Sequence, residues 1–321
     1  MATNKILVWG YIDKTGSFVI APQFDDAHDF HGALAVVKLG YLRAYIDTKG
    51  EFVIPPKFQA ADNFDEDGLA RVMFDDKWGF IMRDGAFAIE PRFDKATEFH
   101  HGLATVCVDG KYGFINKVGE YLAQPVFQFV GEFHDGLAWV CLDGKYGFVD
   151  LSGKMAVEPM FENAGNFSDG LAPVMAAGKY GFIDMTGNFI IKPQYDFAEA
   201  FVHGTARVKV DRTWIYIDTS GTQVAEPAPS AEIPTPVFHD GLTPASDGSG
   251  KVGYKNEEGD FAIPPVYCEA EPFREGLARV KATPKGKWAY INPDGKPAFK
   301  AKFIQAANFA EGLARVLVER P

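Results

Sequence analysis

Histidine and acidic side chains collect in one recurring loop of this chain, directly before a Gly-Leu-Ala-like strand. The loop holds His31, His100, His101, His134, His203 and His239 together with Glu66, Asp67, Asp135, Asp169, Asp240, Glu275 and Glu311. Imidazoles and carboxylates on one rim could bind a cation, a metal or a basic peptide, and protonation of the histidines would weaken such a site below about pH 6.5. The alternative is that these are ordinary turn residues before a glycine, in loops too far apart to share one ligand.

A second candidate is a single position in the first strand of each repeat, which varies while its neighbours stay constant. We call it the slot, and it is occupied by Arg71, Thr105, Trp139, Pro173, Arg207, Pro244, Arg279 and Arg315. A constant frame with one variable position is how repeat proteins display recognition surfaces, and Arg and Trp are enriched at interface hot spots. The slot therefore predicts a binding surface. The alternative is a position that faces solvent or a water-filled channel.

Both features belong to a tandem repeat whose marker is an aromatic-Gly-aromatic strand. Full or partial copies of it stand at residues 9–11, 43–45, 78–80, 112–114, 146–148, 180–182, 214–216, 252–254 and 288–290, with Ala44, Ile215 and Ala289 in place of the glycine. The spacing is 34 or 35 residues through the first seven copies and then 38 and 36. A period of this size indicates an array of supersecondary units that bury their hydrophobic faces against one another. We therefore expect one repeat domain over residues 1–321.

Residues 102–135 show how one unit is built. Asp109-Gly110 between two alternating segments predicts a tight hairpin, and Asn116 with Gly119 predicts a capped turn into a third strand. The third strand is expected to end at a Pro, and the following Phe-x-x-Ala-x-x-Phe segment is expected to form a short edge strand rather than a helical turn. The small residue between the two aromatics predicts that a neighbouring sheet or ring packs over the backbone there.

The two ends of the chain complement each other. Residues 5–13 are predicted to form a second strand without a first, and residues 312–316 a first strand without a second. Pairing them would complete a ninth unit without leaving unpaired strand edges. The predicted fold is all-β, a closed, β-propeller-like toroid of about nine short, mostly three-stranded blades. An open β-solenoid is the alternative.

The recurring Gly-Leu-Ala-x-Val, Gly-Lys-Tyr-Gly-Phe-Ile-Asp and Pro-x-Phe-x-x-Ala segments resemble the WG-repeat (KWG-repeat) family of bacterial proteins. The resemblance covers essentially the whole chain and weakens only between about residues 222 and 250. It implies a repeat-based binding or structural module and transfers no catalytic motif. Tyr often replaces Trp in the aromatic strand, as at Tyr112, Tyr146 and Tyr180, which keeps an aromatic ring there.

One unit is irregular. Residues 226–251 replace the expected Pro-x-Phe with a Pro-rich and then Gly/Ser-rich segment. Such a segment is either functional or a tolerated insertion.

Charge and composition restrict the function further. The net charge of -11 and the pI near 5.1 argue against duplex nucleic acid and favour a cationic or neutral partner. There is no stretch of 18 apolar residues and no room for a signal peptide, so we expect no membrane association and a cytoplasmic location. Phosphate-binding, nucleophile-elbow and zinc-protease motifs are absent, so we expect no enzyme, cofactor or dedicated metal. The predicted function is a non-catalytic scaffold for protein or peptide binding, and the alternative is a lectin-type module for glycans or small ligands.

Overall fold

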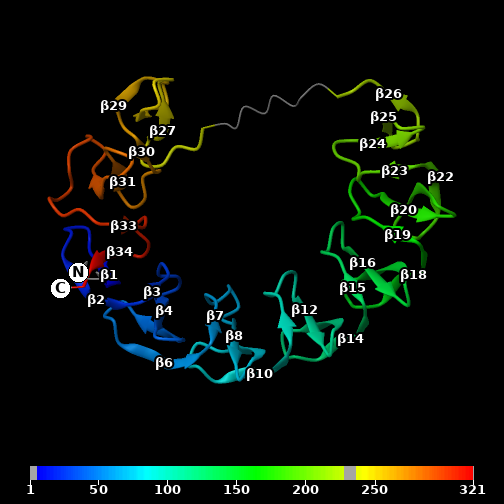
Figure 1. Ribbon diagram of the computed structural model, residues 1–321, viewed down its shortest axis with the longest axis horizontal. Helices are drawn as coiled ribbons and strands as arrows, with labels where there is room; N and C mark the ends of the chain where they lie inside the picture. Colours follow the sequence, from blue (N-terminus) through cyan, green and yellow to red (C-terminus); the bar gives the residue numbers. More distant parts are fainter. Residues whose placement is uncertain (1–5, 228–235, 321) are drawn as a thin grey trace, which may run out of the picture. The chain divides into compact units, whose positions relative to one another are not determined.

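The protein consists of short antiparallel sheets throughout the residues that the computed structural model describes, 6–227 and 236–320. Nine sheets follow one another along the chain, seven with four strands and two with three (Figure 1). Those residues hold no helix of a length and apolarity that could span a membrane. The predicted all-β repeat is confirmed. The sheets are mostly four-stranded rather than three-stranded, because the Phe-x-x-Ala segment adds the predicted short edge strand.

The chain divides into two compact units. Unit 1 comprises Met1–Asp76, Phe80–Phe87 and Ile233–Pro321, and unit 2 comprises Lys77–Gly79 and Ala88–Glu232. The boundary runs through the sheet of β7 (Ala60–Ala61), β8 (Ala70–Phe74), β9 (Lys77–Ile81) and β10 (Phe87–Phe93). The expectation of one domain over residues 1–321 stays a prediction.

Unit 1 holds four further sheets. Their strands are β1 (Leu7–Ile12), β2 (Phe18–Phe24), β33 (Gln305–Ala306) and β34 (Ala314–Glu319) in the first; β3 (Asp26–Ala27), β4 (Leu34–Leu39), β5 (Leu42–Asp47) and β6 (Phe52–Phe58) in the second; β27 (Thr243–Ser246), β28 (Val252–Lys255) and β29 (Phe261–Tyr267) in the third; and β30 (Glu269–Ala270), β31 (Ala278–Lys281) and β32 (Trp288–Ile291) in the fourth.

Unit 2 holds four sheets of four strands. Their strands are β11 (Lys95–Ala96), β12 (Leu103–Val108), β13 (Lys111–Asn116) and β14 (Tyr121–Phe127); β15 (Phe129–Val130), β16 (Leu137–Leu142), β17 (Lys145–Asp150) and β18 (Met155–Phe161); β19 (Asn163–Ala164), β20 (Ala172–Ala176), β21 (Lys179–Ile183) and β22 (Phe189–Tyr195); and β23 (Phe197–Ala198), β24 (Thr205–Val210), β25 (Thr213–Asp218) and β26 (Gln223–Val224).

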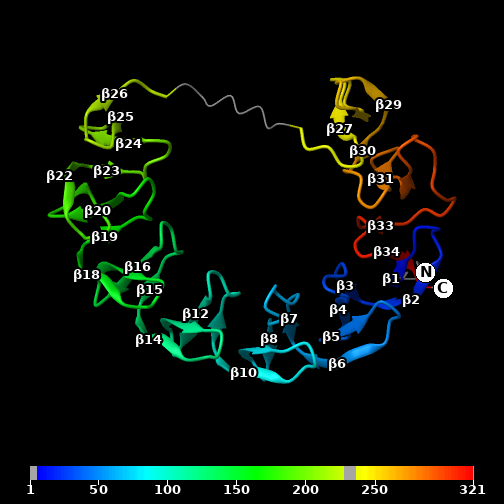
Figure 2. The ribbon, with the colours of Figure 1, turned by 180° about the vertical axis from the view of Figure 1, so that it is seen from behind.

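The first and last strands of the chain share one sheet, which we call the terminal sheet. Its order is β2-β1-β34-β33, and β1 pairs with β34 from Leu7 opposite Glu319 to Ile12 opposite Ala314. Both views show the two strands side by side (Figures 1 and 2). The predicted pairing of the chain ends is confirmed. Closure of the whole array into a toroid stays a prediction, and residues 228–235 of the 226–251 segment lie outside the described residues.

The glycine of the aromatic strand makes room within its own sheet, not for a neighbouring sheet as the sequence suggested. Tyr146 pairs with Phe161 and Phe148 with Val157, so the third strand bulges opposite Gly147. A Cβ at Gly147 would lie 2.5 Å from the Val157 carbonyl oxygen and 2.7 Å from the Pro159 nitrogen. The third strand also continues past its proline instead of ending there, because the bulge takes that residue out of the hydrogen-bond ladder.

The predicted turns are present. Asp109 and Gly110 have φ values of 50° and 74°, the pair of positive angles that a type I′ hairpin turn requires. In the turn between β17 and β18, Asp150 Oδ1 accepts hydrogen bonds from Ser152 N at 2.8 Å and Lys154 N at 3.1 Å. The hydroxyl of Ser152, which also donates to this carboxylate, is the largest cause of the lowered pKa of Asp150.

The hydrophobic core lies between successive sheets. Phe148 is fully buried and packs with Phe167, Ala172 and Ile183 of the next sheet, with 4.8 Å between the two ring centroids. Val149 points to the other face and joins the core with the preceding sheet. The alternation of side chains along the aromatic strand therefore positions each sheet against both neighbours.

In the four sheets that lie wholly within unit 1, a tyrosine takes the place of this phenylalanine. Tyr11, Tyr45, Tyr254 and Tyr290 each donate a hydrogen bond from the hydroxyl to a backbone carbonyl 17 residues later. Burial raises the pKa of all four hydroxyls, so they remain neutral donors.

Candidate functional site

Seven of the eight slot residues, all but Pro244, face a second variable position directly after the short edge strand of their own sheet. The backbone carbonyl of the slot residue accepts a hydrogen bond from the N–H of that second residue, as from Gly131 N to Trp139 O at 2.8 Å. The same bond joins Asp62 to Arg71, Thr97 to Thr105, Gly165 to Pro173, Glu199 to Arg207, Glu271 to Arg279 and Ala307 to Arg315. We call this second position the partner position. Slot and partner together form one surface element in each of these seven sheets.

The two positions complement each other in charge. Arg71 in the slot pairs with Asp62 in the partner position, and Arg207 pairs with Glu199. The nitrogen-to-oxygen distance is 2.7 Å in both pairs. Arg279 and Glu271 form a longer ion pair at 3.5 Å. The predicted arginines of the slot are therefore not free cations, because a carboxylate of the same sheet accompanies each of these three.

The two positions also complement each other in size. Trp139 lies against Gly131, where a Cβ would collide with the indole nitrogen, and Pro173 lies against Gly165, where a Cβ would be 2.8 Å from the proline ring. Small partners thus accommodate bulky slot residues. Sequence reasoning identified the slot but missed the partner, although the spacing of eight or nine residues between the two is visible in the chain.

Arg315 is the exception to this arrangement. Its partner position holds Ala307, and its guanidinium reaches the next sheet, where Nε donates to Asp29 Oδ1 at 2.7 Å and Nη1 to the Ala27 carbonyl. The guanidinium lies 5.2 Å from the centre of the Trp9 ring. Arg279 and Arg207 stack in the same way on Trp288 at 4.8 Å and Trp214 at 4.3 Å.

The rim loops turn out to be tight turns linked from sheet to sheet. Asp135, Asp169 and Asp240 have φ values near 50°, each directly before a glycine that also has positive φ. Their carboxylates accept hydrogen bonds from backbone N–H groups of the equivalent turn in the next repeat: Asp135 from Gly170 at 3.1 Å, Asp169 from Gly204 at 2.7 Å and Asp240 from Gly276 at 3.0 Å. Glu275 accepts the same kind of bond from Gly312 N, and Glu311 accepts it from Gly32 N and Ala33 N. These bonds favour the turn interpretation of the rim acids.

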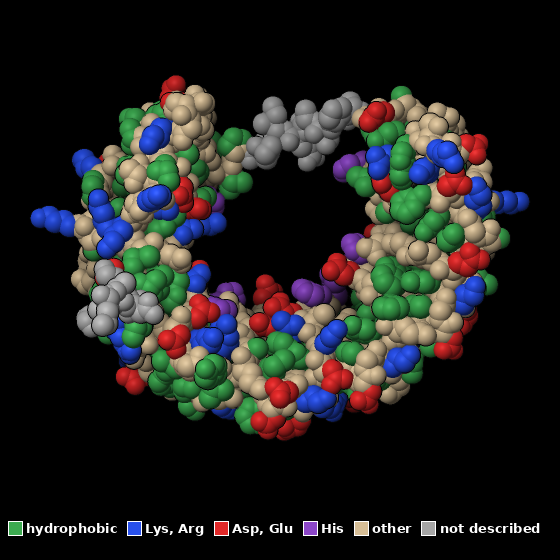
Figure 3. Space-filling view, in the orientation of Figure 1, with side chains coloured by type: hydrophobic (Ala, Val, Ile, Leu, Met, Phe, Trp, Pro, Cys, Tyr) green, Lys and Arg blue, Asp and Glu red, His purple; other side chains and the backbone are tan. Residues whose placement is uncertain are grey.

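The histidines share these turns without forming a metal site. His100, His134 and His239 each form an isolated bridge with the leucine that follows the turn, and His101 and His203 are positive-φ turn residues. Figure 3 shows histidines along one edge of the unit 2 sheets, close to acidic side chains. Within residues 6–227 and 236–320, no three His, Cys, Asp or Glu side chains come close enough to hold a metal ion.

One histidine that sequence reasoning did not select is partly buried. His28 Nε2 lies 3.2 Å from Arg43 Nη1. Burial, followed by the charge of Arg43, lowers the pKa of His28, which keeps the ring neutral.

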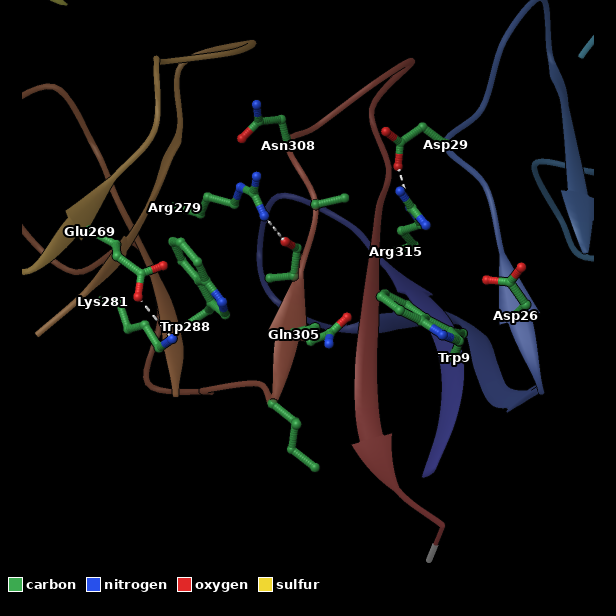
Figure 4. Close-up of a pocket in the computed structure, with 13 residues that line it drawn as sticks. Trp9, Asp26, Asp29, Glu269, Arg279, Lys281, Trp288, Gln305, Asn308 and Arg315 are labelled. Atoms are coloured by element: carbon green, nitrogen blue, oxygen red, sulfur yellow. Dashed lines mark hydrogen bonds and ion pairs between the residues drawn. The ribbon is translucent and has the colours of Figure 1, made fainter. Parts of the chain in front are cut away.

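Three cavities lie along these positions. One of about 620 Å³ is in unit 1 and is lined by Trp9, Arg279, Lys281, Trp288, Asn308 and Arg315 among others (Figure 4). Two cavities of about 360 and 440 Å³ in unit 2 share Thr97, Thr105, Gly131 and Glu132. Trp139 lines the second of these. The slot surface therefore includes concave sites in both units.

The rim bonds give a first testable prediction. Asp169→Ala should lower the free energy of unfolding by about 1 kcal/mol, because Gly204 N loses a charged acceptor. The matched control is Asp143→Ala, because Asp143 lies in a hairpin turn and its φ is within 5° of that of Asp169. The control measures the backbone strain of an alanine at positive φ, so the remaining difference is due to the lost bond. Urea denaturation of both variants measures the difference, and equal losses would show that the bond between the sheets contributes nothing.

Comparison with known families finds the same repeat. The family model described as a WG containing repeat matches residues 9–42, 44–78, 78–112, 112–146, 146–180, 180–214, 253–283 and 288–319. These segments make up well over half of the chain. No curated protein matches it.

Several solved structures resemble the chain weakly. The crystal structure of the eukaryotic initiation factor shares 10% identity at a TM-score of 0.41, covering 99% of this chain and 100% of that one. Hsv2 of Kluyveromyces lactis shares 9% identity at a TM-score of 0.33, covering 83% of this chain and 96% of that one. Streptogramin B lyase shares 12% identity at a TM-score of 0.29, covering 98% of each chain. The fold assignment therefore depends on the sheets of this chain itself.

Proposed function

This chain belongs to the family of WG-containing repeat proteins, and from that premise we propose that it is a non-catalytic scaffold that binds a protein or peptide through its slot and partner positions. The observation that carries the proposal is the matched variation of these two positions on a constant frame. Trp139 with Gly131, Arg207 with Glu199 and Thr105 with Thr97 present different chemistry at one structurally equivalent place. A series of unlike neighbouring patches suits an extended partner better than a single small substrate.

The net charge of the chain favours a basic partner. The chain carries a net charge of -11, and the slot arginines of the β7–β10 and β23–β26 sheets are each paired with a carboxylate. The surplus negative charge therefore lies elsewhere and would attract a basic partner over a distance of about 8–10 Å at physiological salt. Trp139, half-buried beside a cavity of about 440 Å³, is the strongest single candidate for an anchor contact.

A capture experiment with paired variants tests this proposal. The tagged full chain is incubated with native lysate at near-physiological salt, in parallel with Thr105→Ala/Trp139→Ala and with the control Val126→Ala/Met160→Ala. The control changes exposed residues of β14 and β18, at the other edge of the same two sheets. A genuine partner should be retained by the native chain and the control and fall at least about tenfold with the slot variant. Recovery of no specific protein, or equal recovery with both variants, would refute the proposal.

A further inference from the structure

One cavity of unit 2 lies at a place where other repeats hold an arginine of the chain. Its volume is about 440 Å³, in the range of ligand sites. Its lining includes Thr105, the slot residue of the β11–β14 sheet, and Val130 and Glu132 at the edge of the β15–β18 sheet. Arginines at equivalent places therefore indicate which group this cavity accepts.

Arg315 shows how unit 1 holds a guanidinium at this place. Its Nη1 donates to the carbonyl of Ala27, the last residue of the edge strand β3, and its Nε donates to Asp29 Oδ1 at 2.7 Å. The guanidinium also lies 5.2 Å from the centre of the Trp9 ring (Figure 4). One carbonyl, one carboxylate and one aromatic ring thus hold a single guanidinium.

The two acceptors recur around the cavity of unit 2. Val130 is the last residue of β15, and Glu132 follows it by two residues. Asp29 follows Ala27 in the same way. The carbonyl at this place faces the slot of the preceding sheet, because Ala306 at the end of β33 also accepts a hydrogen bond from a slot arginine. The edge of the β15–β18 sheet therefore offers the same pair of acceptors.

Tyr112 provides the aromatic ring. It lines the cavity and is the first aromatic residue of its repeat marker, the place that a tryptophan takes in the terminal sheet. Lys95 Nζ lies 3.3 Å from the Tyr112 hydroxyl and 5.9 Å from the ring centre. A second cation is compatible with this contact, because Arg207 and Lys209 both lie over the one ring of Trp214. The Tyr112 ring can therefore take a guanidinium as well.

The slot residue is what differs. Thr105 has no charge and lacks the chain of methylene groups with which an arginine reaches the neighbouring sheet. Glu132 accordingly has no slot cation beside it. Its side chain is 92% exposed, and within residues 6–227 and 236–320 its ion-pair contact is a long one, 3.9 Å to His134 Nε2. A carboxylate, a carbonyl and a ring are thus in place for a guanidinium that this repeat does not supply.

We propose that this cavity binds the side chain of an arginine from a basic partner protein. The guanidinium of the guest donates to the Val130 carbonyl and to the Glu132 carboxylate and lies against the Tyr112 ring. A planar guanidinium can donate to two acceptors and stack on a ring at once, whereas a lysine ammonium is a compact point charge. The net charge of -11 favours the approach of such a partner. This inference rests on the proposed function and names the residue that one of its sites recognises.

Nuclear magnetic resonance of the full chain labelled with 15N-tryptophan tests the site, because Trp139 lines the cavity. Its indole N–H signal is assigned with Trp139→Phe, and the remaining indole signals are references. The probe is N-acetyl-L-arginine N-methylamide, compared with the lysine analogue and with the citrulline analogue, which has the same length but no charge. Maltose is titrated in parallel. We expect a saturable shift of the Trp139 signal with the arginine probe and at least about threefold weaker binding of the two analogues.

Two variants address the two sides of the site. Thr105→Arg places an arginine in the slot, as at Arg315, so the chain itself should occupy the site and weaken binding of the arginine probe at least about fivefold. Glu132→Gln removes the charge of the acceptor and should weaken binding about threefold. The controls Val126→Arg and Glu158→Gln make the same changes in charge at exposed positions of β14 and β18 that do not line the cavity, and should leave binding unchanged.

The outcomes separate clearly. A preference for the arginine probe that falls in Thr105→Arg and Glu132→Gln and persists in both controls supports the site. No saturable shift, equal shifts of all the indole signals, equal affinity for either analogue, unchanged binding by Thr105→Arg, or binding of maltose alone overturns it. The dispersion of the indole signals verifies that each variant is folded, and Glu132→Gln, at an exposed side chain, keeps the test informative if Thr105→Arg is not.

The capture experiment distinguishes this inference from the proposed function. A captured protein that is lost with Thr105→Ala/Trp139→Ala but retained unchanged by Glu132→Gln would leave the scaffold function standing and refute the arginine site. A protein that is lost with both, and that is released by an excess of the arginine probe but not of the citrulline analogue, supports the two together.

Discussion

Deletion of residues 312–321 is expected to unfold the first repeat as well as the last. These residues include β34, which lies between β1 and β33 in the terminal sheet and forms six residue pairs with β1. Val316 is fully buried in the core that also contains Ile12 and Tyr290. Without β34, β1 keeps only its hairpin with β2, and an isolated two-stranded hairpin is marginal in water. Hydrogen exchange should show loss of protection at residues 7–24, about 300 residues away from the deletion.

Two comparisons make this result decisive. Deletion of Arg320 and Pro321 alone leaves β34 intact and should preserve protection at residues 7–24. Within unit 2, the amides of β16 to β21 should retain their protection in both truncated chains. Unchanged exchange at residues 7–24 in the longer deletion would mean that β1 does not depend on β34 in solution.

Phe148→Ala is expected to produce the largest effect of any single substitution discussed for unit 2. The ring is fully buried between two sheets and contacts Phe167, and deletion of a buried Phe side chain lowers stability by about 3–5 kcal/mol. Phe129→Ala in the same repeat is the control. Its side chain is 59% exposed on the edge strand β15, so the loss should stay below about 1 kcal/mol.

Urea denaturation, followed by a signal from unit 2, measures the loss of stability in both variants. Because repeat arrays can lose cooperativity, the slope of the transition should be compared together with its midpoint. A lower midpoint at unchanged slope indicates destabilisation of the whole transition. A similar midpoint for Phe148→Ala and Phe129→Ala would show that the core does not lie between successive sheets as described.

The features predicted correctly from the sequence are those that one repeat determines locally. Asp109-Gly110 specifies its own turn through positive φ, and the Phe-x-x-Ala segment specifies its own short edge strand. The pairing of β1 with β34 could be predicted because each chain end lacked the strand that the other supplied. Membership of the repeat family follows from the same local patterns.

The features that were missed depend on contacts between residues of different strands or sheets. Gly147 indicated a close approach, but a bulge in the third strand, rather than a neighbouring sheet, makes that approach. The rim carboxylate of Asp169 was considered as a ligand group, and its bond to Gly204 N becomes visible only when successive turns are placed together.

The terminal sheet also has a consequence for biosynthesis. The other sheets form from strands that are neighbours in the chain, so each can assemble soon after it leaves the ribosome. β1 must wait for β34, and at 5–20 residues per second the intervening 300 or so residues take roughly 15–60 s to translate. Throughout that interval the β1–β2 hairpin has an unpaired edge, which other nascent chains could engage. The exposure of this edge is therefore governed by the speed of translation of the repeats in between.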